Sequence, residues 1–249
     1  EIIPGTADMV LVMEDLAPME QGDQLVGSTF EQAQVAVREA ARLHGSTWDS
    51  DSLSSKDWLT KRKSSDIGDF VALVHQLFFS FFSRYKGDVS KSAIDVGNNF
   101  LPLIHKWLRT APDPICLTHG DFRLDNLMFD MEVERALVVV DWQTVSFGVG
   151  ISDISYFLGS GLLPALRSQY EKILVQEYYD VLKSYLEPRI YTFSECWYGY
   201  RRQSFGGYLM AIVAAMLVER TQRGDQMFLA MLERHADQVV QLDAFSLLS

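Results

Sequence analysis

A mostly helical α+β fold is predicted by three features of the sequence. Long segments with apolar residues at helical spacing fill most of the chain. Most of the short, strand-like apolar runs lie between residues 115 and 140, separated by polar or glycine-containing turns. The polar sequence motifs are concentrated among these runs. We therefore expect a helical body that carries a few short strands, with the functional residues between the strands.

The first part of the chain is expected to contain one strand and three helices. Met9–Met13 is an unbroken apolar run of strand length. Ser28 and Glu31 fit a capping box, which predicts a helix that runs to about His44. The polar stretch 49–65 is expected to be a mobile loop. Two further helices are predicted at about 66–85 and 91–109.

The central part of the chain is expected to form short strands before helices return. The strand-like pieces are Ile115 to Thr118, Leu127 to Phe129 and Ala136 to Val140. The polar turn between the last two predicts that they pair as an antiparallel hairpin. After Gly150, helices are predicted at about 151–160, 165–186, 194–222 and 225–242.

Composition excludes several classes of protein. The net charge of -11 argues against a nucleic-acid partner, because phosphate backbones select basic surfaces. The longest apolar run, Phe205 to Val218, is too short to span a bilayer, and we expect no membrane partner. Cys116 and Cys196 form neither a disulfide framework nor a metal cluster, and we see no secretion signal. A cytoplasmic location is therefore expected.

One segment carries the chemistry. It runs from Leu117 to Phe129 with the letters Leu-Thr-His-Gly-Asp-Phe-Arg-Leu-Asp-Asn-Leu-Met-Phe. Asn126 precedes the first hairpin strand and Asp141 follows the second, so the hairpin should bring them together at its open end. An amide oxygen and a carboxylate are hard ligands of the kind that Mg²⁺ takes. Asp121, on the entering loop, can face the same point without binding the metal.

This pattern resembles the catalytic and metal-binding loops of protein kinases and their small-molecule relatives. His-x-Asp-x-x-x-x-Asn is followed by a hydrophobic strand that ends in Asp. The sequences His119-Gly120-Asp121 and Asp141-Trp142 resemble those of the aminoglycoside phosphotransferase and choline kinase branch, including its ecdysteroid kinase-like relatives. The resemblance covers about residues 9–160. It implies a protein-kinase-like fold, mainly its helical C-terminal lobe, and the use of ATP and Mg²⁺.

The resemblance implies a role for each residue of the motif. Asp121 would be the catalytic base, Asn126 and Asp141 would bind magnesium, and His119 would brace the loop. For Arg123, contact with the transferred phosphate is one interpretation and a position without that role is the other. The neighbouring Asp125 is interpreted as solvated or bonded within its turn rather than as a metal ligand.

Two further segments match the same family. Met13-Glu14-Asp15-Leu16 resembles the hinge whose backbone holds adenine, and Asp153 resembles a buried aspartate that braces the catalytic loop through backbone N–H groups. Residues 1–16 would then be the last strand of the small lobe and the hinge, and residues 17–249 the catalytic lobe. The rest of the small lobe, with its phosphate-binding lysine, is expected to precede residue 1 in a longer native protein.

Several assignments stay open at this point. His44 and Trp48 match a Leu-His-x-x-x-Trp pattern of these relatives, but a helix-end histidine bonded to backbone explains them equally well. Relatives build the acceptor pocket from late helices, while ordinary helix packing explains the same residues. The candidates for that pocket are Trp197, Tyr198, Arg201 and Arg202.

The function predicted from the sequence is transfer of the ATP γ-phosphoryl group to a hydroxyl of a small molecule. A nucleotide-binding pseudokinase is one alternative, although an inactive site has no need for all of Asp121, Asn126 and Asp141. A metal-dependent phosphoesterase is the other, although it would want more carboxylate or histidine ligands. Neither the acceptor nor the oligomeric state can be predicted from the sequence.

Overall fold

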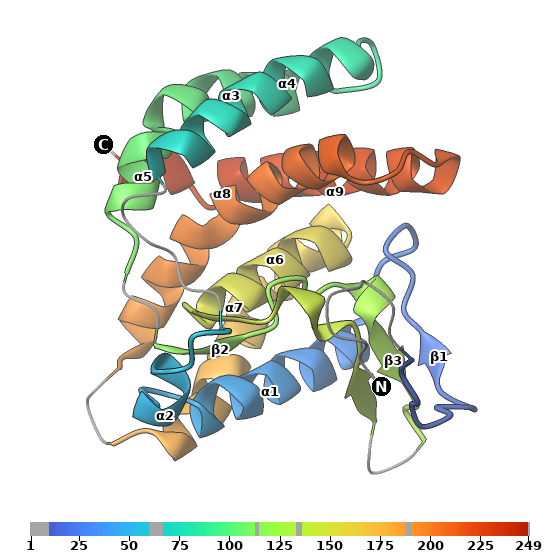
Figure 1. Cartoon of the computed structure of the whole chain (residues 1–249), viewed down its shortest axis with the longest axis vertical. Coiled ribbons are helices and arrows are strands. Elements are labelled where there is room, and N and C mark those ends of the chain that lie inside the picture. Colours follow the sequence, from blue (N-terminus) through green and yellow to red (C-terminus); the bar gives the residue numbers. More distant parts are fainter. Residues whose placement is uncertain (1–9, 60–66, 113–114, 133–135, 188–190, 249) are drawn as a thin grey trace.

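A computed structural model describes residues 10–59, 67–112, 115–132, 136–187 and 191–248. It confirms the α+β prediction, with helices stacked in layers (Figure 1) and a few short strands. The helices of the first half are α1 (Phe30–Ser46), α2 (Asp51–Ser54), α3 (Ile67–Arg84), α4 (Lys91–Phe100) and α5 (Ile104–Arg109). Those of the second half are α6 (Ile151–Gly161), α7 (Pro164–Leu182), α8 (Phe193–Leu217) and α9 (Gln222–Gln241).

Two small antiparallel sheets carry the polar motif. The first has the order β1 (Glu20–Gln21), β3 (Leu127–Phe129), β4 (Leu137–Val139). In it, β3 and β4 form the predicted hairpin, with Leu127 opposite Val139. The second sheet pairs β2 (Cys116–Thr118) with β5 (Ser146–Gly148). The two sheets bring both ends of the motif, near residues 118 and 141, to the same side of the helical body.

Two hydrophobic clusters hold the helices together. One joins α3, α4 and α5 to α8 and α9, with Phe81, Phe100 and Phe205 fully or almost fully buried. The other joins α1, α6 and α7 to the β3–β4 hairpin through Phe122 and Leu127. Helix α8 belongs to both, because its first turns face the second cluster and its later turns face the first. The catalytic-loop candidates therefore lie on a packed scaffold.

Several helix starts follow from side-chain caps, and one expected cap is shifted. The capping box of α1 uses Thr29 and Gln32, not Ser28 and Glu31, so that prediction was wrong by one residue. Ser28 is buried in the segment before the cap, which leaves Thr29 as the residue whose oxygen reaches the N–H of Gln32. Thr192 caps α8 in the same way, with Glu195 as its partner.

Two other expectations differ from the structure. Met9 lies outside the described residues, and Val10–Met13 form no strand; these four side chains are between 67% and 90% exposed. A strand needs a neighbouring strand for its backbone, and neither sheet of the described chain includes this segment. In the stretch 49–65 predicted as a mobile loop, Asp51–Ser54 form the short helix α2, and residues 60–65 lie outside the described residues. None of the helices in the described chain combines the length and apolar character needed to cross a membrane.

Candidate active site

The predicted catalytic loop leaves β2 after Thr118 and returns to β3 through a 3₁₀ turn at Leu124–Asn126. Gly120 has a φ of 82°, and a Cβ there would lie 2.6 Å from the carbonyl oxygen of Thr144. Glycine is therefore required by both the backbone conformation and the space. Backbone bonds from Arg123 N to Asp121 O and from Asn126 N to Arg123 O, both 2.9 Å, fix the rest of the loop.

His119 ties the loop to the end of the hairpin. Its Nε2 lies 3.0 Å from the carbonyl oxygen of Val140, and its Nδ1 lies 3.3 Å from the backbone nitrogen of Asp121. These two contacts require a neutral imidazole that donates a hydrogen bond from Nε2 and accepts one at Nδ1. Thr144 donates to the His119 carbonyl at 2.8 Å. These contacts agree with the bracing role proposed for His119.

Asp153, at the start of α6, lies directly beneath the loop and is 2% exposed. Its carboxylate accepts the backbone N–H of His119 at 2.7 Å and that of Gly120 at 3.1 Å. His44 Nε2 lies 3.3 Å from the same carboxylate, and His44 Nδ1 lies 3.0 Å from the hydroxyl of Tyr178. These are the backbone contacts that the bracing role of Asp153 requires. His44 thus bonds to side chains, so the backbone-bonded interpretation was wrong.

Asp121 is surrounded by donors. The Nε of Arg123 lies 3.1 Å from each carboxylate oxygen, Asn126 Nδ2 donates at 3.0 Å, and the Tyr156 hydroxyl donates at 3.0 Å. Burial, followed by the Asp121 charge, holds the pKa of Tyr156 well above its usual value, so the phenol stays a donor. Tyr156 in turn stacks parallel to the fully buried ring of His235. Burial lowers the pKa of His235 to about 3, which keeps that ring neutral.

The two predicted metal ligands lie at the same end of the β3–β4 hairpin, Asn126 just before β3 and Asp141 two residues after β4. Val140 N donates to Asn126 O at 3.0 Å, so Asn126 is bonded to the residue that precedes Asp141. Asn126 uses its amide nitrogen for Asp121, and within the described chain no hydrogen bond engages its Oδ1. Asp141 is exposed, with a left-handed φ of 62°, and is contacted by Gln143 Nε2 at 3.3 Å. An amide oxygen and a carboxylate are ligand types that magnesium takes, and their role as metal ligands stays a prediction.

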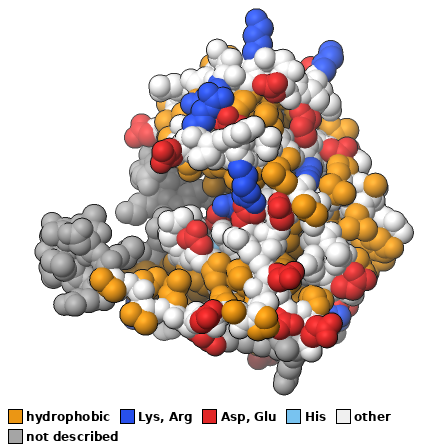
Figure 2. Space-filling model, turned by 90° about the vertical axis from the view of Figure 1, so that its right-hand side faces the viewer, with side chains coloured by type: hydrophobic (Ala, Val, Ile, Leu, Met, Phe, Trp, Pro, Cys, Tyr) orange, Lys and Arg blue, Asp and Glu red, His pale blue; other side chains and the backbone are white. Residues whose placement is uncertain are grey.

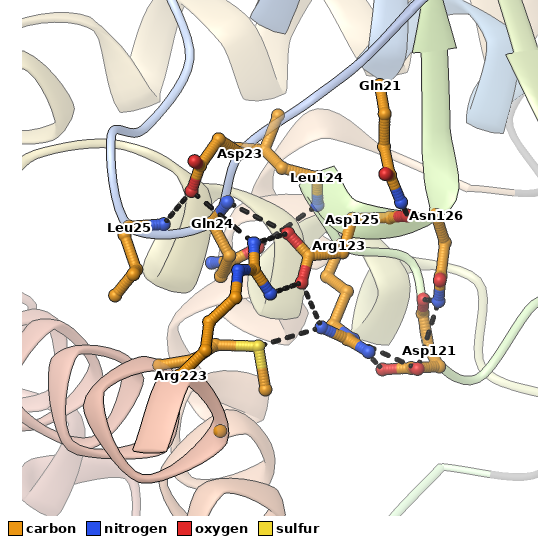
Figure 3. Close-up of polar contacts among 12 residues, drawn as sticks. Gln21, Asp23, Gln24, Leu25, Asp121, Arg123, Leu124, Asp125, Asn126 and Arg223 are labelled. Atoms are coloured by element: carbon orange, nitrogen blue, oxygen red, sulfur yellow. Dashed lines mark hydrogen bonds and ion pairs between the residues drawn. The ribbon is translucent and has the colours of Figure 1, made fainter. Parts of the chain in front are cut away.

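A further group of charges, which the sequence did not predict, adjoins Asp121 (Figure 3). Asp125 accepts from Arg123 at 3.1 Å, from Arg223 of α9 at 2.9 Å, and from the backbone N–H of Gln24 at 3.0 Å. Burial would raise the pKa of Asp125, but the bond to Arg223, with the others, lowers it. Asp125 is thus held mainly by long-range partners rather than by its own turn.

Arg123 is the centre of this group. Besides Asp121 and Asp125, its Nη1 lies 3.0 Å from the sulfur of Met227. Burial would lower the pKa of Arg123, but the charges of Asp121, Tyr156 and Asp125 and the hydrogen bond to Asp121 together raise it. The guanidinium therefore stays charged between two carboxylates.

On the face of the molecule in Figure 2, Lys and Arg side chains lie in separate groups with acidic side chains between them.

The predicted hinge, Met13 to Leu16, lies before β1 in a segment that has neither helix nor strand. Met13 is 74% exposed, and Asp15 accepts the backbone N–H of Ala17 at 3.0 Å. Met19 N donates to Leu16 O at 2.8 Å, which turns the chain toward β1. Since β1 pairs with β3, the segment leads to the strand that follows Asn126. Its role in holding adenine stays a prediction.

The four candidates for the acceptor pocket do not share one surface. Arg202 is 2% exposed and donates to the carbonyl of Trp107 and, at 3.0 Å, to the hydroxyl of Thr110. Arg201 donates to the carbonyl oxygen of Leu242 at 2.8 Å. These two contacts favour the packing interpretation. The other two candidates differ from each other, since Trp197 stacks on Tyr200, 5.3 Å between ring centroids, whereas Tyr198 is 48% exposed.

The comparison with protein families identifies the class. The model of the ecdysteroid kinase-like family matches residues 4–189, which is most of the chain. The chain therefore belongs to the ecdysteroid kinase-like family, a kinase-like phosphotransferase class. This family is one of those that the His-Gly-Asp and Asp-Trp motifs resemble.

Individual relatives match over shorter segments. Acyl-CoA dehydrogenase family member 11 of Rattus norvegicus is 43% identical over 54 residues, which are 20% of this chain and 7% of the relative. Acyl-CoA dehydrogenase family member 10 of Mus musculus is 43% identical over 49 residues, 20% of this chain and 5% of the relative. The matched region is thus a small part of the length of these curated relatives.

One solved structure is also among the matches. It is the crystal structure of an inferred aminoglycoside phosphotransferase from Ralstonia eutropha, with a TM-score of 0.48 and 15% sequence identity. The alignment covers 89% of this chain and 69% of that chain.

Proposed function

We propose that this protein transfers the γ-phosphoryl group of ATP to a hydroxyl group of a small molecule, with magnesium. The observation that supports this best is the position of Asp121. Its carboxylate is bonded directly to Asn126, and His119 connects its loop to the residue before Asp141. A proton acceptor and two oxygen ligands at one hairpin end are the parts that phosphoryl transfer requires.

A residue of this chain can be assigned to each step of the proposed reaction. The acceptor oxygen forms a bond to the γ-phosphorus, its proton passes to a carboxylate oxygen of Asp121, and the bond to the β–γ bridging oxygen breaks as ADP leaves. Asn126 and Asp141 would hold Mg²⁺, which would neutralise phosphate charge. Met13 to Leu16 would contact adenine. We also propose a cytoplasmic location, because ATP and reducing conditions occur together in the cytoplasm.

The structure adds a condition to this mechanism. Both carboxylate oxygens of Asp121 already accept hydrogen bonds, from Arg123, Asn126 and Tyr156. An acceptor hydroxyl must therefore displace or share one of these donors. Arg123 is the most suitable to move, because it has other partners in Asp125 and Met227 and its charge suits a phosphate oxygen. We therefore propose that the Arg123 side chain moves from Asp121 to the transferred phosphate.

The test is an acceptor screen with the native, full-length protein. ADP release is measured with Mg·ATP over a library of hydroxyl compounds, and the phosphorylated product is identified by ³¹P NMR. The proposal expects ADP release that depends on one class of hydroxyl compound. Nucleotide binding without turnover over the whole library would instead indicate a pseudokinase. Release of phosphate from phosphate esters without ATP would indicate a phosphoesterase.

A further inference from the structure

An apolar cavity lies at the opposite end of β2 from the catalytic loop. Its volume is about 420 Å³, within the range of small-molecule sites. Ile115 precedes β2 and lines the cavity, whereas Thr118 ends β2 at the catalytic loop, about 10 Å further along the strand. The cavity is therefore separate from the candidate active site. Its main lining side chains are Trp48, Ile115, Val149, Tyr178, Tyr191 and Tyr198.

The lining is mainly apolar and aromatic, and three of its polar groups are bonded to neighbouring residues. The Tyr178 hydroxyl lies 3.0 Å from His44 Nδ1, and the Tyr191 carbonyl accepts from Tyr179 at 3.2 Å. Glu195 brings the charge nearest to the cavity, but its carboxylate accepts both the N–H and the hydroxyl of Thr192 at 2.7 Å. Trp48 and Tyr191 pack with ring centroids 5.3 Å apart. Aromatic faces without a free charge suit a ligand that is apolar and contains rings.

Two walls of the cavity touch the brace beneath the catalytic loop. Tyr178 contacts His44, and a Cβ on Gly150 would lie 2.8 Å from the His44 ring. His44 contacts Asp153, which holds the backbone N–H groups of His119 and Gly120. A molecule in the cavity thus contacts residues that are two side chains away from the loop.

We propose that this cavity binds an uncharged, ring-containing apolar small molecule and that its occupancy stabilises the catalytic loop through Tyr178, His44 and Asp153. Binding in the cavity does not depend on the proposed phosphotransfer. The coupling is measured on backbone amides rather than on turnover, so a failure of the proposed function leaves this test intact.

The first experiment measures binding with the neutral fluorescent probe N-phenyl-1-naphthylamine. Ser194 lines the cavity at an exposed position, so Ser194→Trp should obstruct the cavity without replacing a residue of the core. The matched control is Ser168→Trp, at an exposed position on α7 away from the cavity. We expect saturable binding that Ser194→Trp weakens by about tenfold or more and that Ser168→Trp leaves within about twofold. Equal affinity in all three proteins would overturn the site.

A competition arm tests the ligand class. The probe is displaced with 1-methylnaphthalene and, separately, with the cation 1-naphthylmethylammonium. The proposal expects the neutral compound to compete better. Stronger competition by the cation would show that the Glu195 carboxylate dominates recognition, which contradicts an uncharged ligand.

The second experiment measures the coupling by amide hydrogen exchange, followed in peptides that contain residues 117–122. The probe should slow exchange of the His119 and Gly120 amides by about fivefold or more. Tyr178→Phe keeps the aromatic wall but removes the hydroxyl that reaches His44, so it should keep the binding and lose most of this slowing. Bound probe with unchanged exchange in the wild-type protein would overturn the coupling, as would full slowing in Tyr178→Phe.

Discussion

The two polar groups on either side of the catalytic loop differ in burial and in the partners that hold them. Beneath the loop, His44 and Asp153 are at most 2% exposed, and Asp153 binds backbone N–H groups. Beside the loop, Asp125 is paired with the side chain of Arg223, which is 54% exposed. A buried carboxylate bonded to backbone resists change, because every lost bond leaves a desolvated group. Exposed ion pairs are weak and exchange partners easily.

This difference suggests a division of work. The buried group beneath the loop keeps the backbone of His119 and Gly120 in place. The charged group beside it positions Arg123, whose side chain can change partners when a phosphate arrives. The catalytic loop would then combine a fixed backbone with a movable guanidinium. Substitutions in the two groups should therefore have effects of different size and kind.

The largest effect is expected for Asp153→Asn. The amide keeps the shape but replaces one acceptor oxygen with a donor, which faces a backbone N–H. We expect a loss of about 2–4 kcal/mol in the free energy of unfolding, from two damaged charge-assisted bonds. Urea unfolding measures it. The control Asp130→Asn, in the hairpin turn, should cost less than about 1 kcal/mol. Similar losses in both variants would contradict the special position of Asp153.

An intermediate effect is expected for Tyr156→Phe, which removes one donor from Asp121. If Tyr156 positions the base, kcat should fall about tenfold, equivalent to about 1.4 kcal/mol, while the affinity for Mg·ATP stays within about twofold. The control is Tyr208→Phe, another buried tyrosine, whose hydroxyl donates to the Ala93 carbonyl at 2.8 Å. That variant should lose stability but keep kcat. An equal fall of kcat in both variants would indicate a general packing effect.

The smallest effect is expected for Arg223→Gln. The Arg223 side chain is 54% exposed, and Asp125 keeps its bonds to Arg123 and to the backbone of Gln24, so the loss of stability should be below about 1 kcal/mol. The difference from wild type should shrink further in about 1 M salt, where charges are screened over about 3 Å. Thermal unfolding at low and high salt measures both. A salt-independent loss, or a kcat reduced more than about tenfold, would place Arg223 among the residues that contact substrate.

The sequence predicted features that depend on local pattern. The β3–β4 hairpin and the positions of most helices follow from apolar spacing and turn residues, and the motif placed Asn126 and Asp141 at adjoining strand ends. The two-residue strand β1 was missed, because Glu20–Gln21 carries no apolar alternation. Strand β5 was missed as well, since Ser146–Gly148 is short and contains a glycine.

Long-range contacts could not be predicted from one sequence. Asp125 meets Gln24 and Arg223, about a hundred residues away on either side, and nothing in its neighbours indicates either partner. The same limit applies to His44, whose contacts lie on α6 and α7. The expected strand over residues 9–13 failed in its described part for a related reason. Apolar character favours a strand, but pairing with another strand decides whether one forms.

The central claim is that Asp121 and Asp141 do different work at one site, and calorimetric titration of two variants with Mg·ATP tests it most directly. The full-length protein is used, with ADP release measured in parallel. Asp141→Asn should lose Mg·ATP affinity and turnover together, because the carboxylate would bind the metal. Asp121→Asn should keep its affinity within about threefold, while kcat falls by about 10²–10⁴-fold. If Asp121→Asn loses nucleotide affinity as severely as Asp141→Asn, Asp121 belongs to the metal site and its assignment as the base is wrong.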